Sequence, residues 1–343
     1  TAMIGPPGRT FYVSEKAVYV WMSDWAARAN KPRSLLARMP LDGGGPSAVV
    51  TSGAPVDQFS FSERGSELDV LVRSDSAGDA MWAPETAAGD VALLRLPLAT
   101  FSSAVTDAPA SRYTSLPKPA GNAWSFQNRF VGDWLLYGSG MSWGYAQQAT
   151  DNSVVAYHVS DAQSAPMKLE LPHGVDRIEA LGKNAIVVGS DGKDLHFTAI
   201  ALGATAKTEG HYVRAGASQG ETRSQGFFYK ASSDEQGMLA LPIRSGAQPG
   251  WSQLVQGSAS IVFLKNDALD FSPMGELEAS RLASTNDACR ASCVDWYGNA
   301  RPIFWRGRVF GLMGYELVEG KIDSGRILER RRLDFAPGAN ALR

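Results

Sequence analysis

The sequence predicts an all-β protein, and specifically a β-propeller built from repeated four-stranded antiparallel blades. Short apolar strands alternate with polar turns along the chain, and convincing helical periodicity is scarce. The 35 glycines and 18 prolines are dispersed over all 343 residues instead of gathering in a few loops. Short strands at even spacing, separated by turn residues, are typical of propellers and related all-β folds.

The strands are predicted in pairs, each with a polar turn between two apolar segments. In chain order the first four pairs cover 11–20, 59–72, 130–137 and 185–197, and further hairpins are predicted at 227–241, 261–271 and 303–312. The fourth pair turns at Asp191 and Gly192, and an Asp-Gly dipeptide is a strong hairpin signal. Both faces of segment 17–22 are apolar, as expected of a strand packed between neighbouring blades.

The spacing of these pairs indicates the number of blades. Steps between first strands are 48, 71, 48, 49, 34 and 42 residues, for units beginning at Phe11, Phe59, Phe130, Ile178, Phe227, Ile261 and Ile303. The long step contains a polar segment of 22 residues at 102–123, and without it 49 residues remain. A propeller blade needs roughly 40 to 50 residues. We therefore predict one domain over 1–343 with seven blades, six or eight being the alternatives, and an inter-blade insert at 102–123.

Composition excludes several classes of protein. The 33 basic and 35 acidic residues give a net charge of -2, so no general field attracts nucleic acid. Hydrophobic residues make up 44% of the chain and charged residues 20%, which excludes wholesale disorder. The longest apolar run has six residues, at 17–22, too few for a membrane-spanning helix. The one dense basic run, at 330–332, is predicted to lie in a last, partly exposed strand.

Two cysteines, Cys289 and Cys293, bear on the compartment. On a helical turn this spacing would bring their Cα atoms within about 6 Å, which suits a disulfide. Two free buried thiols are the alternative. A zinc site is not expected, because the nearest histidine, His211, is 78 positions away. We predict a disulfide between Cys289 and Cys293, and hence an oxidising compartment.

Catalytic motifs are weak. Residues 140–144 read Gly-Met-Ser-Trp-Gly, which matches a nucleophile elbow, but no predicted helix follows Ser142. A glycine-rich loop is the preferred interpretation, although His158 or His173 as a partner of Ser142 stays open. The four histidines do not fall at metal-ligand spacing, so we predict no metal, no cofactor and no catalytic residue.

Three aspartates, Asp57, Asp133 and Asp176, recur near the starts of predicted blades. Such positions could converge near a propeller channel and bind a cation, a sugar or a basic group, whereas capping of turns is the alternative. Several of the nine tryptophans lie next to loops, among them Trp143 and Trp296. Loop aromatics bind sugars and proteins well, although packing between blades is the alternative. These five residues are the predicted binding set.

The opening residues suggest a family. Thr-Phe-Tyr-Val-Ser at 10–14 with Val-Tyr-Val at 18–20, and later 34–41, resembles an opening blade of the secreted bacterial β-propeller domain proteins. Residues 58–63 with 68–72 look like that family's next strand pair. The match covers about the first 75 residues. It implies a propeller in the bacterial envelope or outside the cell, and it transfers no catalytic residue.

We therefore predict a non-enzymatic binding or scaffolding module, periplasmic or secreted and monomeric. It would recognise a protein or polysaccharide partner at one propeller face. The alternative is a glycan hydrolase or lyase that uses Asp57, Asp133 and Asp176, since glycoside hydrolysis needs paired carboxylates about 5 to 10 Å apart. A third possibility is that the chain is the recognition part of a longer polypeptide.

Overall fold

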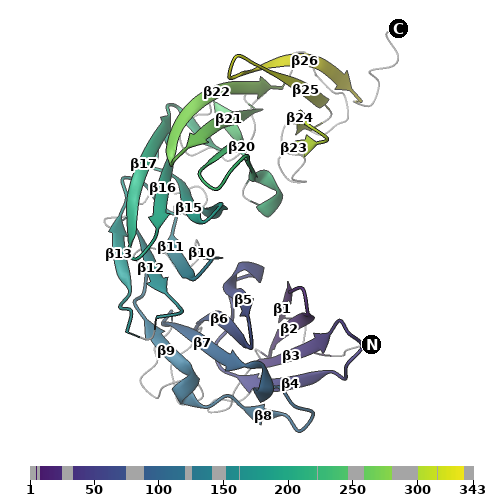
Figure 1. Ribbon diagram of the computed structural model, residues 1–343, viewed down its shortest axis with the longest axis vertical. Helices are drawn as coiled ribbons and strands as arrows, with labels where there is room; N and C mark the ends of the chain where they lie inside the picture. Colours follow the sequence, from purple (N-terminus) through teal and green to yellow (C-terminus); the bar gives the residue numbers. More distant parts are fainter. Residues whose placement is uncertain are drawn as a thin grey trace. The chain divides into compact units, whose positions relative to one another are not determined.

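The structure is a computed structural model that describes residues 5, 8–24, 34–74, 89–119, 126–140, 152–161, 163–221, 223–245, 259–279, 300–314 and 316–335. Within these ranges the regular elements are β-strands and short 3-10 helices (Figure 1). The strands form six sheets, each of at least four strands. The prediction of an all-β propeller fold is thus confirmed. No helix among the described residues has the length and apolar character needed to cross a membrane.

In every sheet, most neighbours in space are also neighbours in sequence, which is the meander of a propeller blade. The first sheet consists of β1 (Gly8–Val13), β2 (Ala17–Ser23), β3 (Ser34–Pro40) and β4 (Ser47–Thr51), with β8 (Thr106–Asp107) added parallel to β4. The second consists of β5 (Phe61–Arg64), β6 (Glu67–Arg73), β7 (Val91–Pro97) and β9 (Tyr113–Leu116), with 3-10 turns η1 (Gln58–Ser60), η2 (Leu98–Thr100) and η3 (Ala110–Arg112) beside them.

The remaining sheets repeat this pattern. The third has β10 (Phe126–Val131), β11 (Trp134–Ser139), β12 (Ser153–His158) and β13 (Met167–Glu170); the fourth has β14 (Arg177–Leu181), β15 (Asn184–Ser190), β16 (Leu195–Leu202) and β17 (Ala206–Arg214). The fifth has β18 (Ala217–Gln219), η5 (Ser224–Gly226), β19 (Phe228–Ala231), β20 (Gln236–Ser245), β21 (Ala259–Asp267) and β22 (Asp270–Glu278). The sixth has β23 (Arg301–Trp305), β24 (Arg308–Met313), β25 (Glu316–Asp323) and β26 (Arg326–Asp334).

The chain divides into two compact units. Unit 1 comprises Thr1–Pro119, Asn128–Tyr137 and Tyr157–Pro166, and unit 2 comprises Ala120–Gln127, Gly138–Ala156 and Met167–Arg343. In unit 1, Trp21 and Leu36 of the first sheet share a core with Phe61 and Leu68 of the second. Strand β2 is buried along both faces, as its sequence predicted.

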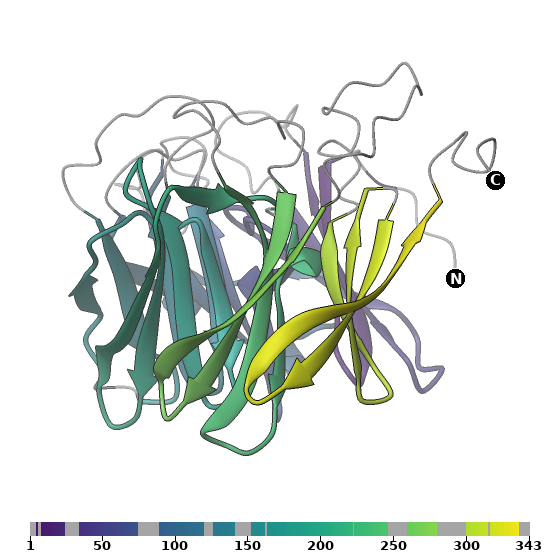
Figure 2. The same cartoon turned by 90° about the horizontal axis from the view of Figure 1, so that it is seen from above.

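Two cores in the described part of unit 2 lie between neighbouring sheets. One lies between the fourth and fifth sheets and includes Phe197 and Leu241. The other lies between the fifth and sixth sheets and includes Phe263 and Val318. The yellow strands β23–β26 accordingly lie next to the green strands β20–β22 in both views (Figures 1 and 2). The fifth sheet therefore buries two faces, which explains its continuous apolar strands.

The prediction of seven blades is corrected to six sheets within the described residues. The units anchored at Phe227 and Ile261 belong to one sheet, because β20 pairs with β19 on one side and with β21 on the other. A four-stranded meander contains overlapping hairpins, so two hairpin signals in this stretch came from one sheet.

The insert predicted at 102–123 has another role in its described part. It supplies β8, which extends the first sheet, and β9, which is the fourth strand of the second sheet. Leu116 of β9 lies opposite Val91 of β7. The Tyr113 hydroxyl accepts a hydrogen bond of 2.9 Å from the Ser52 amide. Within 102–119, the segments Thr106–Asp107 and Tyr113–Leu116 thus belong to sheets.

Candidate functional site

Asp57 has the geometry of a capping residue. Its carboxylate accepts hydrogen bonds from the Phe59 amide at 2.8 Å and from the Asn128 side chain at 3.3 Å. The Ser60 hydroxyl in turn accepts from the Asp57 amide at 3.3 Å, which completes a capping box around η1. Burial raises the pKa of Asp57, against the opposing effect of these hydrogen bonds. Its predicted binding role stays a prediction, whereas its contacts support the turn.

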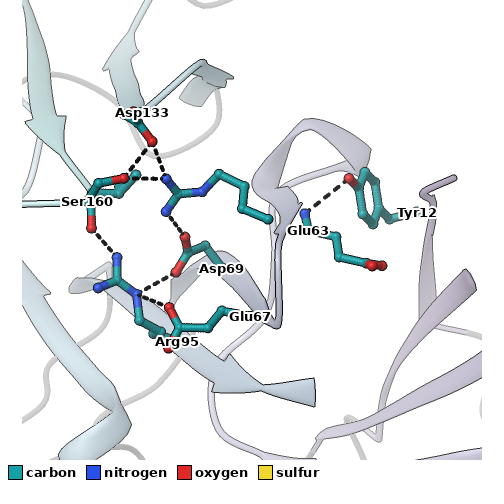
Figure 3. Close-up of polar contacts among 9 residues, drawn as sticks. Tyr12, Glu63, Glu67, Asp69, Arg95, Asp133 and Ser160 are labelled. Atoms are coloured by element: carbon teal, nitrogen blue, oxygen red, sulfur yellow. Dashed lines mark hydrogen bonds and ion pairs between the residues drawn. The ribbon is translucent and has the colours of Figure 1, made fainter. Parts of the chain in front are cut away.

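Asp133 belongs to a network of ion pairs in unit 1 (Figure 3). The centre of this network is Asp69 on β6, which is fully buried and bonded by Arg64 of β5 and by the Nε of Arg95 of β7, the latter at 2.9 Å. The other end of the Arg64 guanidinium donates to Asp133 at 2.6 Å and to the Ser160 hydroxyl at 2.7 Å.

Most nitrogens of the two guanidinium groups, those of Arg64 and Arg95, have an acceptor in the protein. Arg95 also donates to the Val159 carbonyl, and Glu67 lies 3.6 Å from its Nε (Figure 3). Hydrogen bonding from Ser160 and the charge of Arg64 lower the pKa of Asp133. Asp133 shares no partner with Asp57, so the contacts do not join these two carboxylates. The guanidinium groups are committed to protein acceptors, so the arrangement is suited to holding the sheet edge together.

Asp176 lies in unit 2, directly before β14. Its carboxylate accepts from the Ser190 amide at 3.0 Å, and its own amide donates to the Val188 carbonyl at 3.0 Å. Gly140, the first residue of the Gly-x-Ser-x-Gly motif, lies so close that an added Cβ would be 2.1 Å from the Asp176 Oδ1. A side chain at position 140 is therefore excluded by Asp176, which gives this glycine a packing role.

Three of the four histidines, predicted to be scattered, are gathered in unit 2. The rings of His173, His196 and His211 are stacked, with centroids 5.1 Å apart for His173 and His196 and 5.2 Å apart for His196 and His211. His173 precedes β14, His196 lies on β16 and His211 on the neighbouring β17. The Nδ1 of His196 and the Nε2 of His211 are 3.0 Å apart, so one proton links the two rings.

Hydrogen bonds occupy both nitrogens of His173. Its Nδ1 is 2.7 Å from the Gly174 carbonyl and its Nε2 is 2.8 Å from the Thr198 hydroxyl. Burial, together with the charges of the other two rings, lowers the pKa of His173 to about 4. Both ring nitrogens of His173 thus have partners in unit 2, and Ser142, the partner that the sequence left open, lies outside the described residues.

His196 lies beside a carboxylate. The Nε2 of His196 is 3.2 Å from Asp191, which belongs to the turn between β15 and β16. Burial and the charge of His196 lower the pKa of His211. The pKa of Asp191 is also lowered, since the Asp194 and Lys193 amides and His196 outweigh the effect of its partial burial. Among the described residues, no group of three or more His, Cys, Asp or Glu side chains could hold a metal ion.

Within the described part of unit 2, the sixth sheet leaves one face uncovered. Its other face supplies Val309, Met313, Val318 and Ile327 to the core shared with the fifth sheet. Residues that lie opposite each other on neighbouring strands point to the same face of a sheet. The register therefore places on the uncovered face the residues Arg301, Ile303, Trp305, Arg308, Phe310, Leu312, Leu317, Glu319, Lys321, Leu328, Arg331 and Leu333. We call this surface the open face.

Large apolar side chains are exposed on the open face. Trp305 is 53% exposed, Leu328 54% and Leu333 53%. The Arg306 guanidinium lies over the Trp305 ring, 4.8 Å from its centroid. Arg306 and Gly307 form the two-residue turn between β23 and β24 with φ of 48° and 76°. Such left-handed turns favour Asn, Asp or Gly, so an arginine at this position is unusual.

Four predicted residues cannot be placed. Trp143, Trp296, Cys289 and Cys293 lie outside the described residues, as does Ser142. The binding role of the two tryptophans and the disulfide therefore stay predictions. Of the tryptophans in the described ranges, Trp21 and Trp134 are buried, which leaves Trp305 as the exposed one.

Comparisons with known proteins give only distant likenesses. No family model matches the chain, and no curated protein matches its sequence. Among solved structures, a candidate 6-phosphogluconolactonase from Bacteroides uniformis is similar at 11% identity and a TM-score of 0.45, over 98% of this chain and 88% of that one. The WD40 domain of Toxoplasma gondii coronin is similar at 11% identity and a TM-score of 0.39, over 95% and 70% of the two chains. No residue role is carried over from them.

Proposed function

We propose that the chain is a non-enzymatic binding module that recognises a protein partner through the open face of β23–β26. The observation that carries the proposal is the exposure of Trp305, Leu328 and Leu333 on a sheet whose opposite face is buried. Exposed apolar area spread over a whole sheet face is typical of protein interfaces. Tryptophan and arginine also dominate the binding energy of interfaces.

A protein fits this surface better than a polysaccharide does. Apolar side chains lie on several strands of this face, at Leu333, Phe310 and Trp305, between charged residues such as Arg331 and Arg308, so the contact area is broad. A sugar site needs one aromatic platform with polar groups around it, and the face offers more apolar area than that. The location in the bacterial envelope, which the family resemblance and the predicted disulfide support, is part of the proposal.

No observation favours the glycan hydrolase or lyase. Asp57 caps a turn and Asp133 is paired with Arg64 and Ser160, without a shared partner. Asp176 belongs to the other unit and bonds the Ser190 amide.

The test is capture from a bacterial envelope extract on immobilised folded protein, with unfolded protein as the blank. A retained protein is identified by mass spectrometry, purified and titrated against wild type and the double variant Trp305→Ser with Leu328→Ser. Val213→Ser is the matched control, because Val213 is a 40% exposed apolar residue of β17 in the same unit. Loss of two large contacts should weaken binding by 10-fold or more, and the control should bind like wild type.

Three results would reject the proposal. They are equal binding of the double variant and wild type, retention of a polysaccharide in place of a protein, and no retention beyond the unfolded blank. Chemical cross-links from the open face that stay within one chain would also reject it, because the face would then be covered by the protein itself.

A further inference from the structure

We propose that the stack of His173, His196 and His211 is an acid-sensitive latch that holds residues 171–176 in place and releases them on protonation. This inference is independent of the proposed binding face. It rests on the way the three rings share hydrogen bonds and on what the segment of His173 contacts.

With all three rings neutral, every close contact has one donor and one acceptor. The Gly174 carbonyl can only accept, so His173 carries its proton on Nδ1 and its Nε2 accepts from the Thr198 hydroxyl. The Asp191 carboxylate favours a proton on the Nε2 of His196, which leaves Nδ1 of that ring as an acceptor. His211 then donates from its Nε2 to His196. In the neutral stack His211 thus bonds His196, and His173 bonds Gly174 and Thr198, with each donor matched to an acceptor.

Protons added to the stack are not equivalent. A first proton can enter at the Nδ1 of His211, the exposed ring, and leaves these hydrogen bonds intact. A second proton, at the Nδ1 of His196, would set two N–H donors against each other across the 3.0 Å contact. A proton on the Nε2 of His173 would place a charge at a fully buried ring, beside two other imidazoles. Protonation therefore disrupts the contact between His196 and the exposed His211 before it disrupts the contacts of the buried His173.

The segment held by His173 connects several strands. The Val175 amide donates to the Ser139 carbonyl at the end of β11 at 3.0 Å, and the Gly174 amide donates to the Ser190 carbonyl at 3.1 Å. At Gly189 an added Cβ would be 1.7 Å from the Gly174 carbonyl, so the two backbones are in direct contact. Release of this segment would free Ser139 and Gly140, which lead into the Gly-x-Ser-x-Gly motif.

Other charged groups near the stack are mostly paired with each other. Besides its sheet partner β16, strand β17 contacts β13 and β22. They contribute Lys168 with Glu170 at 3.3 Å, and Glu276 with Arg214 of β17 at 2.6 Å. The turn after β15 contributes Asp191, Lys193 and Asp194, and Asp176 bonds the Ser190 amide. Asp191 is therefore the carboxylate in contact with the imidazoles, and it faces His196, not His173.

The size of the effect follows from the difference between the closed and open segment. Once released, His173 would titrate near its ordinary pKa of about 6.5, whereas burial in the stack lowers the pKa to about 4. Linkage then favours the released state at pH 5 by about 30-fold relative to pH 7.5. Local opening by this factor is measurable by amide hydrogen exchange.

The experiment is hydrogen exchange with mass spectrometry on the full chain at pH 7.5 and pH 5.0, corrected for the intrinsic pH dependence of exchange. Protection of a peptide covering 171–176 should fall by about 30-fold, while a peptide from β21 should change much less. His173→Gln should abolish the difference. His158→Gln, at the histidine outside the stack and in unit 1, should behave like wild type.

A second measurement needs no variant. Side-chain nitrogen NMR of histidine-labelled wild type should show His173 as the neutral Nδ1–H form down to pH 5. The proposal is overturned if His173 titrates near its ordinary pKa of about 6.5. It is also overturned if protection of 171–176 does not change with pH, or if it falls in parallel with that of β21, because the change would then be global.

Discussion

Asp69 and Asp133 allow a direct test of how burial sets the value of an ion pair. Both carboxylates bind the same guanidinium, that of Arg64, and therefore share a partner. The Asp69 side chain is 0% exposed, whereas that of Asp133 is 57% exposed. Replacement of each by asparagine keeps the shape of the side chain and removes its charge.

The loss of unfolding free energy should be several-fold larger in Asp69→Asn than in Asp133→Asn. Removing one partner of a buried pair costs about 3 to 5 kcal/mol, because the remaining charge is left without compensation. In Asp69→Asn two guanidinium groups, Arg64 and Arg95, lose their buried counter-ion. An exposed pair is worth about 0.2 to 1 kcal/mol, so Asp133→Asn should lose less than about 1 kcal/mol.

Urea unfolding followed by tryptophan fluorescence and by circular dichroism measures both losses. The Asp133→Asn difference should shrink further in 1 M salt, since screening acts on exposed charges. The Asp69→Asn difference should persist. Equal losses in the two variants, or a loss in Asp69→Asn that disappears with salt, would refute the argument that burial determines the stability contribution of this network.

The other predictions concern the core and pH. The free energy of unfolding should decrease by up to about 3 kcal/mol as pH falls from about 6.5 to about 4. The reason is that the pKa of His173 is about 4 in the folded chain, whereas the unfolded chain binds this proton near pH 6.5. The urea midpoint measured over this pH range checks the prediction. Gly189→Ala should strongly reduce the melting temperature, since its Cβ would meet a backbone carbonyl at 1.7 Å, whereas Gly45→Ala, with open space around it, should be neutral. Phe263→Ala should cost about 3 to 5 kcal/mol, because Phe263 is fully buried, and Phe228→Ala, at a 42% exposed ring, far less.

Much of the fold was predictable because its signals are local. Alternating apolar segments and polar turns identify hairpins, and the strand pairs at 11–20 and 185–197 are found as predicted, in β1–β2 and β15–β16. The basic run at 330–332 was expected in a last, partly exposed strand, and it lies in β26. The number of sheets was harder to predict, because one strand such as β20 takes part in two pairings and contributes to two hairpin signals.

The histidine stack needed information that residue spacing alone does not hold. His196 and His211 lie 15 positions apart, with Gly203 near the midpoint of the hairpin. The register pairs Thr198 with His211, which sets His196 diagonally across from that ring. A correct prediction of the turn between β16 and β17 would therefore have predicted that His196 and His211 are in contact. His173 reaches this pair because the segment before β14 packs against it, and the spacing of residues within a hairpin does not predict such packing.

The local pattern shared by Asp57 and Asp176 illustrates what a repeat can indicate. Each aspartate follows a valine at the start of a sheet, and each accepts a hydrogen bond from a backbone amide. A residue type that recurs at equivalent positions of a repeated unit supports the structure of that unit, so recurrence is poor evidence of a binding site. Features present in one sheet only are better candidates, because the framework does not require them. In the described part of this chain the histidine stack beside β16 and β17 and the open face around Trp305 do not belong to the recurring aspartate pattern, which makes them the better candidates.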